Sequence, residues 1–187
     1  MTTQTARWTA RIDRLSEWLG RAISWLVVLM ILVGAFNAVA RYSSRFTGWN
    51  LSSNAYLELQ WYLFSVVFLL GGSYALKRGA HVRVDVFYAR LGPRGQGTID
   101  LLGTLCFLIP FAVAGVLLSL PSVRNAWSTW ETSPDPGGLA RYPIKTVLPV
   151  GFALLLLQAF AELARSVAVL RGRSEARRDG GGDHSRG

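Results

Sequence analysis

Four long stretches without a charged residue constrain this 187-residue chain more than any other feature. They cover residues 22–40, 59–76, 101–123 and 146–161. A helix that crosses the hydrocarbon core of a bilayer needs about 17–25 mainly apolar residues. Three stretches have this length, and Leu163 and Ala164 extend the fourth past Glu162. The sequence therefore predicts an all-α integral membrane protein with a four-helix membrane domain over residues 1–170. Its transmembrane helices are expected at about 22–41, 57–76, 99–123 and 146–165.

The distribution of basic residues predicts the orientation of these helices. Fifteen of the 20 Lys and Arg residues lie before the first stretch, between the second and third, or after the fourth. Cytoplasmic flanks of membrane helices collect Lys and Arg. We therefore expect both termini in the cytoplasm and residues 41–57 and 124–145 outside. The net charge of +9 then reflects insertion and contact with anionic phospholipids, and it does not require a nucleic acid.

The two ends of the chain are expected to differ. Trp8, Ile12, Leu15 and Leu19 fall on one helical face, so residues 6–20 form a predicted amphipathic helix. This arm either lies in the headgroup plane or protrudes as part of a long first helix. The first apolar stretch is too long for a cleaved secretory signal, so no cleavage is expected. The Gly-rich, charged segment 171–187 is predicted to be a disordered basic cytoplasmic tail.

The second predicted span carries a stripe of polar and small residues. Glu58, Ser65 and Gly72 are spaced by seven, which places them on nearly one helical face, and Gly71 flanks them. Small residues let helices approach closely, so this stripe predicts a packing face for a partner subunit. An acid within a span also suggests a functional site. Glu58 is therefore either a proton or cation site, or a structural acid paired at a contact.

Two other regions stand out along the chain. The external segment 124–145 contains the turn sequence "SPDPGG" and is expected to be a lid, a docking patch or a spacer. Pro110 predicts a kink in the third helix, which is expected to end near Pro121.

Several kinds of chemistry are not supported by the sequence. Cys106 is the one cysteine, so the chain has no internal disulfide and no cysteine cluster for a metal. His81 and His184 lie outside the predicted spans, so they do not form a pair of haem ligands. A Ser–His–Asp triad and a Gly-rich phosphate loop are also lacking. We expect no enzyme, no cofactor and no metal, but a membrane subunit that works with a partner.

One segment resembles a known family. The sequence "ELQWYLFSVVFLLGGSYALKRGAHVRVDVF" is similar to the signature region of the small membrane subunit of tripartite ATP-independent periplasmic (TRAP) transporters, a DctQ-like small permease. The remaining spans and the arm also look like this family. The matching positions are Glu58, Gly71, Lys77, Arg78, Gly79, His81, Val82, Arg83 and Asp85.

The resemblance implies a function in the bacterial inner membrane. Such a transporter has a periplasmic substrate-binding protein, a large elevator-type membrane subunit driven by a sodium gradient, and a small subunit resembling a fixed scaffold. Variants with a longer external loop imply uptake of organic acids of the carboxylate or keto-acid class. Two alternatives remain: a small self-assembling proton-coupled transporter that uses Glu58, and a membrane anchor of a redox complex.

The resemblance also implies roles for individual residues. Lys77, Arg78 and Arg83 would anchor the second helix at the inner headgroups. His81 and Asp85 would share one face of a short cytoplasmic helix and bond each other or the large subunit. The residues expected to contact the binding protein are Trp127, Trp130, Glu131 and Asp135.

Overall fold

The computed structural model describes residues 3–48, 52–79 and 91–179. These residues form four long helical units, and they contain no strand beyond an isolated antiparallel bridge between Thr132 and Ala140. All four units are long and apolar enough to cross a membrane, which confirms the predicted all-α fold with four spans. The elements are α1 (Thr3–Thr47), α2 (Asn54–Lys77), α4 (Pro93–Gly103), a π-helical turn (Thr104–Leu108), α5 (Ile109–Ser128) and α6 (Arg141–Asp179).

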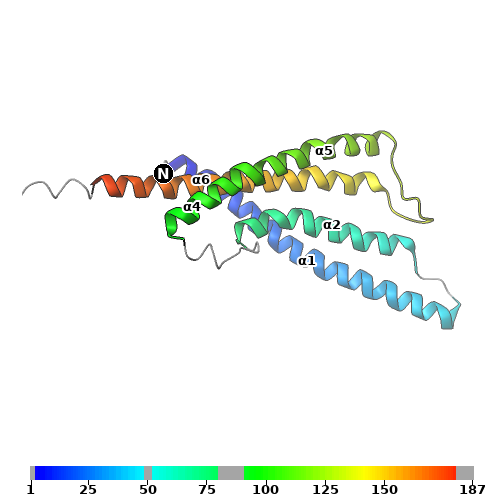
Figure 1. Ribbon diagram of the computed structural model, residues 1–187. Coiled ribbons are helices and arrows are strands. Elements are labelled where there is room, and N and C mark those ends of the chain that lie inside the picture. The colour runs from blue at the N-terminus through cyan, green and yellow to red at the C-terminus, as the bar shows by residue number, and fades with distance from the viewer. Residues whose placement is uncertain (1–2, 49–51, 80–90, 180–187) are drawn as a thin grey trace, which may run out of the picture.

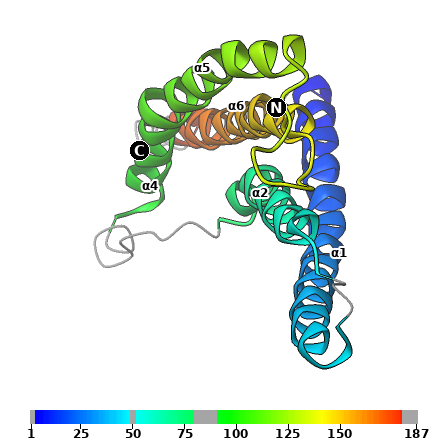
Figure 2. The ribbon, with the colours of Figure 1, turned by 90° about the vertical axis from the view of Figure 1, so that its right-hand side faces the viewer.

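The helices form an open layer rather than a closed bundle. α2 packs between α1 and α6, while α6 packs between α2 and α5 (Figures 1 and 2). α1 also touches α6 where the two helices cross. The most apolar window of α1 is only 6% buried, and that of α6 is 22% buried. Most of the apolar surface of the spans therefore faces away from the rest of the chain.

Both described termini lie at the same end of the layer, as four antiparallel passes require (Figure 1). We call this the terminal end. The opposite end, which we call the loop end, carries Ser53 at the start of α2 and the loop of residues 129–140 between α5 and α6. The charge distribution predicts that the terminal end faces the cytoplasm.

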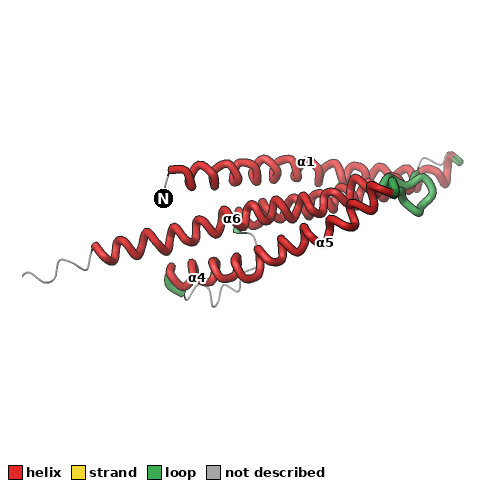
Figure 3. Tube along the Cα trace, turned by 90° about the horizontal axis from the view of Figure 1, so that it is seen from above, coloured by secondary structure: helices red, strands yellow, loops and turns green. Residues whose placement is uncertain are grey.

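α1 combines the predicted arm and the first span in one uninterrupted helix of 45 residues. At 1.5 Å per residue its length is about 68 Å, roughly twice the thickness of the hydrocarbon core. The whole of α1 therefore does not fit across the bilayer core, and part of it lies outside. Figure 3 shows α1 running from the N-terminus toward the loop end.

The third helix passes two prolines. The N–H of Ile109 bonds the carbonyl of Thr104, five residues earlier, which defines the π-helical turn. This wider turn makes room for Pro110, whose ring would crowd the carbonyl four residues before it in an α-helix. Pro121 lies inside α5, which continues to Ser128, so the expected end near Pro121 is wrong. A proline removes one helical hydrogen bond, and the helix continues after it.

α6 extends beyond the predicted domain boundary at residue 170. The helix continues to Asp179, through just over half of the segment 171–187 that was expected to be a disordered tail. Four of residues 171–179 are Arg, which favours helix and accounts for the extension. Residues 180–187, including His184, lie outside the described part of the chain.

Candidate functional site

Glu58 is a buried carboxylate near the start of α2. Its side chain is only 3% exposed. It accepts hydrogen bonds from the Ser133 hydroxyl and from the Leu139 backbone N–H, both in the loop before α6. A Cβ atom on Gly138 would lie 2.7 Å from Glu58 Oε2 and 2.5 Å from Ser133 Cβ. Glycine at this position therefore lets the loop fold tightly around the carboxylate.

Further bonds attach the same loop to α2. The Asn54 side-chain amide donates to the Pro136 carbonyl at 3.1 Å, and the Tyr62 hydroxyl donates to the Ala140 carbonyl at 3.0 Å. Within the loop, Thr132 and Ala140 form the antiparallel bridge. We call these bonds, together with those to Glu58, the loop clamp. They fix residues 133–140 of the loop against α2.

Aromatic side chains gather beside the clamp. The Trp127 ring centroid lies 4.7 Å from that of Tyr142, and the Trp130 centroid lies 5.2 Å from it in an edge-on arrangement. The Trp127 indole N–H donates to the Thr146 hydroxyl at 2.9 Å. Trp130 is 64% exposed, and its φ of 49° is in the left-handed region that bulky residues rarely adopt. The loop therefore presents a fixed, exposed indole.

The two acids predicted beside these tryptophans have different roles in the loop. Glu131 forms an ion pair with Lys145 on α6, and its carbonyl accepts from the Arg141 N–H at 2.8 Å. Asp135 is exposed, and its backbone N–H donates to the Ser133 hydroxyl at 3.1 Å. The structure thus brings all four predicted docking residues to one end of the molecule.

A comparison with known protein families identifies the family of the chain. Residues 30–169 match the family described as "Tripartite ATP-independent periplasmic transporters, DctQ component". The chain belongs to the DctQ family. Its members are transporter components that work with a large membrane subunit and a periplasmic binding protein. The match covers α2, the loop clamp and most of α6. No curated protein and no solved structure matched the chain.

In this DctQ component, the stripe predicted on α2 divides into separate environments. Glu58 bonds the loop of its own chain, while Ser65 bonds the backbone of the preceding helical turn. Gly71 faces Ile23 of α1, with 3.9 Å between a Cβ built on the glycine and Ile23 Cδ1. The space beside Gly72 is open. A partner-subunit contact at the stripe therefore stays a prediction, with Gly72 as its most open position.

The basic residues at the end of α2 bond within the chain. Lys77 Nζ lies 2.8 Å from the Glu17 carboxylate and donates to the Asp13 carbonyl at 2.8 Å. The Arg78 guanidinium lies 5.4 Å from the Tyr74 ring centroid. Lys77 therefore contacts α1, and Arg78 contacts α2. These contacts are compatible with the predicted contacts of both side chains with lipid headgroups.

Beyond Lys77 and Arg78, the structure describes only Gly79 of the predicted turn motif. Gly79 has a φ of 61°, the left-handed conformation that glycine adopts readily at helix ends. His81, Arg83 and Asp85 lie outside the described residues. Their predicted roles stay predictions.

A polar network at the terminal end was not predicted from the sequence. The Ser16 hydroxyl donates to Gln158 Oε1 at 2.8 Å, and the Gln158 amide donates to Asp13 at 3.2 Å. Arg165 donates to both Asp13 carboxylate oxygens at 3.0 Å and also pairs with Glu162. The Gln158 side chain is fully buried. The sequence feature that pointed to this network was Gln158 within the fourth apolar stretch, because a polar side chain inside a span needs a hydrogen-bond partner.

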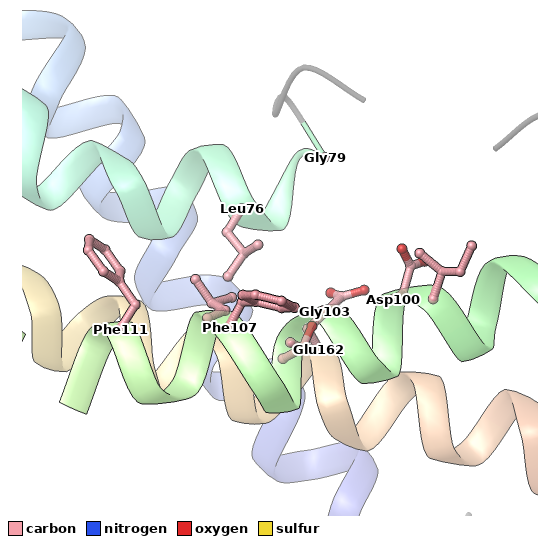
Figure 4. Close-up of a pocket in the computed structure, with 10 residues that line it drawn as sticks. Leu76, Gly79, Asp100, Gly103, Phe107, Phe111 and Glu162 are labelled. Atoms are coloured by element: carbon pink, nitrogen blue, oxygen red, sulfur yellow. The ribbon is translucent and has the colours of Figure 1, made fainter. Parts of the chain in front are cut away.

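A cavity of about 570 Å³ lies nearby between α2, α6 and the third helix (Figure 4). Its lining is mainly apolar, with Leu76 of α2 pointing toward Phe107 of the π-helical turn (Figure 4). Of its two carboxylates, Glu162 pairs with Arg165, and Asp100 also has an interaction partner. No group of three potential metal ligands occurs among the described residues.

Proposed function

We propose that the chain is the small scaffold subunit of a sodium-driven TRAP transporter that takes up organic acids in the bacterial inner membrane. In this role it packs against the large elevator-type subunit and stabilises it. The open layer is the observation that carries the proposal. A helix such as α1, whose most apolar window is 6% buried, leaves a long face for another membrane protein or for lipid.

The position of the charged residues supports a scaffold rather than a pathway. The described ion pairs join residues near or beyond the ends of the predicted spans, at the loop end or the terminal end. Glu58 is held by donors of its own loop, so its carboxylate has a structural use. These observations weigh against Glu58 as a coupling acid that alternately faces the two sides of the membrane.

The loop clamp supports contact with the periplasmic binding protein. A loop held in place in the free protein loses little conformational entropy when it binds a partner. Exposed tryptophan is frequent among the residues that dominate binding at interfaces. The left-handed backbone of Trp130 is a local strain of a kind that clusters at functional sites. We therefore place the docking surface on Trp127, Trp130, Glu131 and Asp135.

Reconstitution tests the proposal against its alternative. Proteoliposomes would contain the large subunit with this chain, the large subunit alone, or this chain alone, each with the binding protein outside. A sodium gradient should drive uptake from a panel of organic acids only when both membrane subunits are present. Uptake by this chain alone, abolished by Glu58→Gln, would instead establish the proton-coupled transporter.

A further inference from the structure

A second hollow, at the loop end, has a different chemistry from the cavity at the terminal end. It is a groove of about 440 Å³ between α1 and α2. α1 contributes Gly34, Asn37, Arg41 and Arg45, while α2 contributes Leu57 and Gln60. Neither the loop clamp nor the DctQ match explains why two arginines and two amides line one groove.

Neither arginine of the groove pairs with a carboxylate in the described part of the chain. Arg41 and Arg45 are four residues apart, so they lie on one face of α1, and both are exposed. The ion pairs among the described residues use Lys77, Lys145 and Arg165 instead. The mouth of the groove thus carries two positive charges that are free to bind an anion.

The floor of the groove is polar although it lies within a span. Asn37 is only 4% exposed, and its side-chain oxygen has no hydrogen-bond partner among the described residues. The Gln60 amide lies beside Gly34, because a Cβ on Gly34 would come within 2.5 Å of Gln60 Nε2. A half-turn of the Asn37 amide would exchange its oxygen and NH2 group, so it can bond donors or acceptors in the groove.

The order of these groups along α1 matches the order of groups in a lipid. From Asn37 to Arg45 the helix rises about 12 Å toward the loop end. The groove therefore presents the amides first and the guanidinium groups nearer the loop end. On α1, the exposed apolar side chains of Ile31 and Leu32 come before the groove, toward the middle of the span. A glycerophospholipid presents acyl chains, then ester carbonyls, then a phosphodiester. Guanidinium groups bind phosphate through paired, charge-assisted hydrogen bonds.

We propose that this groove is a binding site for one anionic glycerophospholipid. Arg41 and Arg45 hold the phosphodiester, while the amides of Asn37 and Gln60 bond the ester region. A protein carboxylate would satisfy the arginines but would leave the amides unpaired, so the lipid accounts for more of the groove. The site belongs to this chain alone, and it does not depend on the proposed function.

Native mass spectrometry of the full-length chain tests the site. The protein would be released from nanodiscs that contain equal amounts of phosphatidylglycerol and phosphatidylcholine. The wild-type chain should retain one phosphatidylglycerol molecule. Arg41→Ala/Arg45→Ala should reduce that adduct about tenfold or more, because each charge-assisted bond to phosphate is lost. Arg124→Ala, which removes an exposed arginine elsewhere at the loop end, should leave it unchanged.

A second variant separates a built site from general attraction of arginine to headgroups. Ala38 lines the groove and is exposed, so Ala38→Trp fills the groove but keeps both arginines. This variant should also lose the adduct while keeping the wild-type circular dichroism spectrum. Retention of the lipid by Ala38→Trp, or equal losses in the Arg124→Ala control, would overturn the proposal. A wild-type chain that retains no phosphatidylglycerol would also overturn the proposal. So would the finding that Arg41 and Arg45 bind the large subunit instead of a lipid.

Discussion

At the residue scale, the role of Glu58 depends on partners far away in the sequence. The spacing of Glu58, Ser65 and Gly72 predicts one helical face, but it does not identify what each residue touches. Ser133 and Leu139 are 75 and 81 residues from Glu58. Periodicity describes one helix at a time, so the loop that covers the carboxylate could not be predicted from the spacing on α2.

Removal of the Glu58 carboxylate should loosen the loop of residues 129–140. Glu58→Ala leaves the Ser133 hydroxyl and the Leu139 N–H without their acceptor. Amide hydrogen exchange in residues 131–140 should then accelerate about tenfold or more, since local opening becomes easier. Asp135→Asn removes a carboxylate that projects from the same loop, and it should leave exchange near the wild-type rate. Equal exchange in all three proteins would contradict the clamp.

Gly138 should tolerate a methyl group much less well than Gly72. A Cβ on Gly138 meets Ser133 and Glu58 at less than 3 Å, whereas a Cβ on Gly72 meets nothing within 4 Å. Gly138→Ala should lower the stability by about 1–3 kcal/mol through overpacking. Gly72→Ala should be neutral or slightly stabilising, because alanine favours helix. Thermal denaturation in detergent measures both, and a reversed order would refute the close packing.

At the element scale, the four spans were predictable because charge-free length is a direct consequence of the bilayer. Helix ends were less predictable, since Pro121 does not end α5 and the charged residues after Leu170 continue α6. The network that ties α1 to α6 was missed, because Asp13 and Arg165 are 152 residues apart. A sequence read segment by segment does not show which distant polar groups meet.

That network should hold the arm of α1 in place. Asp13→Ala removes the acceptor of Arg165 and of Gln158, and leaving such partners unsatisfied costs about 1–3 kcal/mol. We expect a lower melting temperature and faster proteolysis between residues 3 and 20. Glu17→Gln, which alters the more exposed ion pair with Lys77, is the matched control. Unchanged proteolysis in Asp13→Ala would show that the network does not hold the arm.

At the scale of the whole molecule, the open layer limits what the chain does alone. The order α1, α2, α6, α5 leaves two edge helices, each with one long neighbour along most of its length. Composition predicted a membrane protein with a partner, and the resemblance at Glu58–Asp85 predicted the family to which residues 30–169 belong. Neither defined the layer, because the order of helices in space depends on packing between distant segments.

The exposed indole at the loop end should affect docking without affecting assembly. Trp130→Ala should raise the concentration of binding protein needed for half-maximal uptake about tenfold, because tryptophan is frequent among interface hot spots. The amount of large subunit that purifies with the chain should not change. Phe107→Ala, which removes an exposed aromatic ring distant from the loop, is the control. Identical concentration dependence in both variants would place docking elsewhere.

Co-purification tests the central claim most directly. The tagged chain would be expressed with the large subunit of its transporter and extracted in mild detergent. A scaffold subunit with so little buried apolar surface should elute as a stable complex with the large subunit. Uptake in proteoliposomes should also disappear when the chain is omitted. Recovery of the chain free of the large subunit, with uptake undiminished in its absence, would contradict the account.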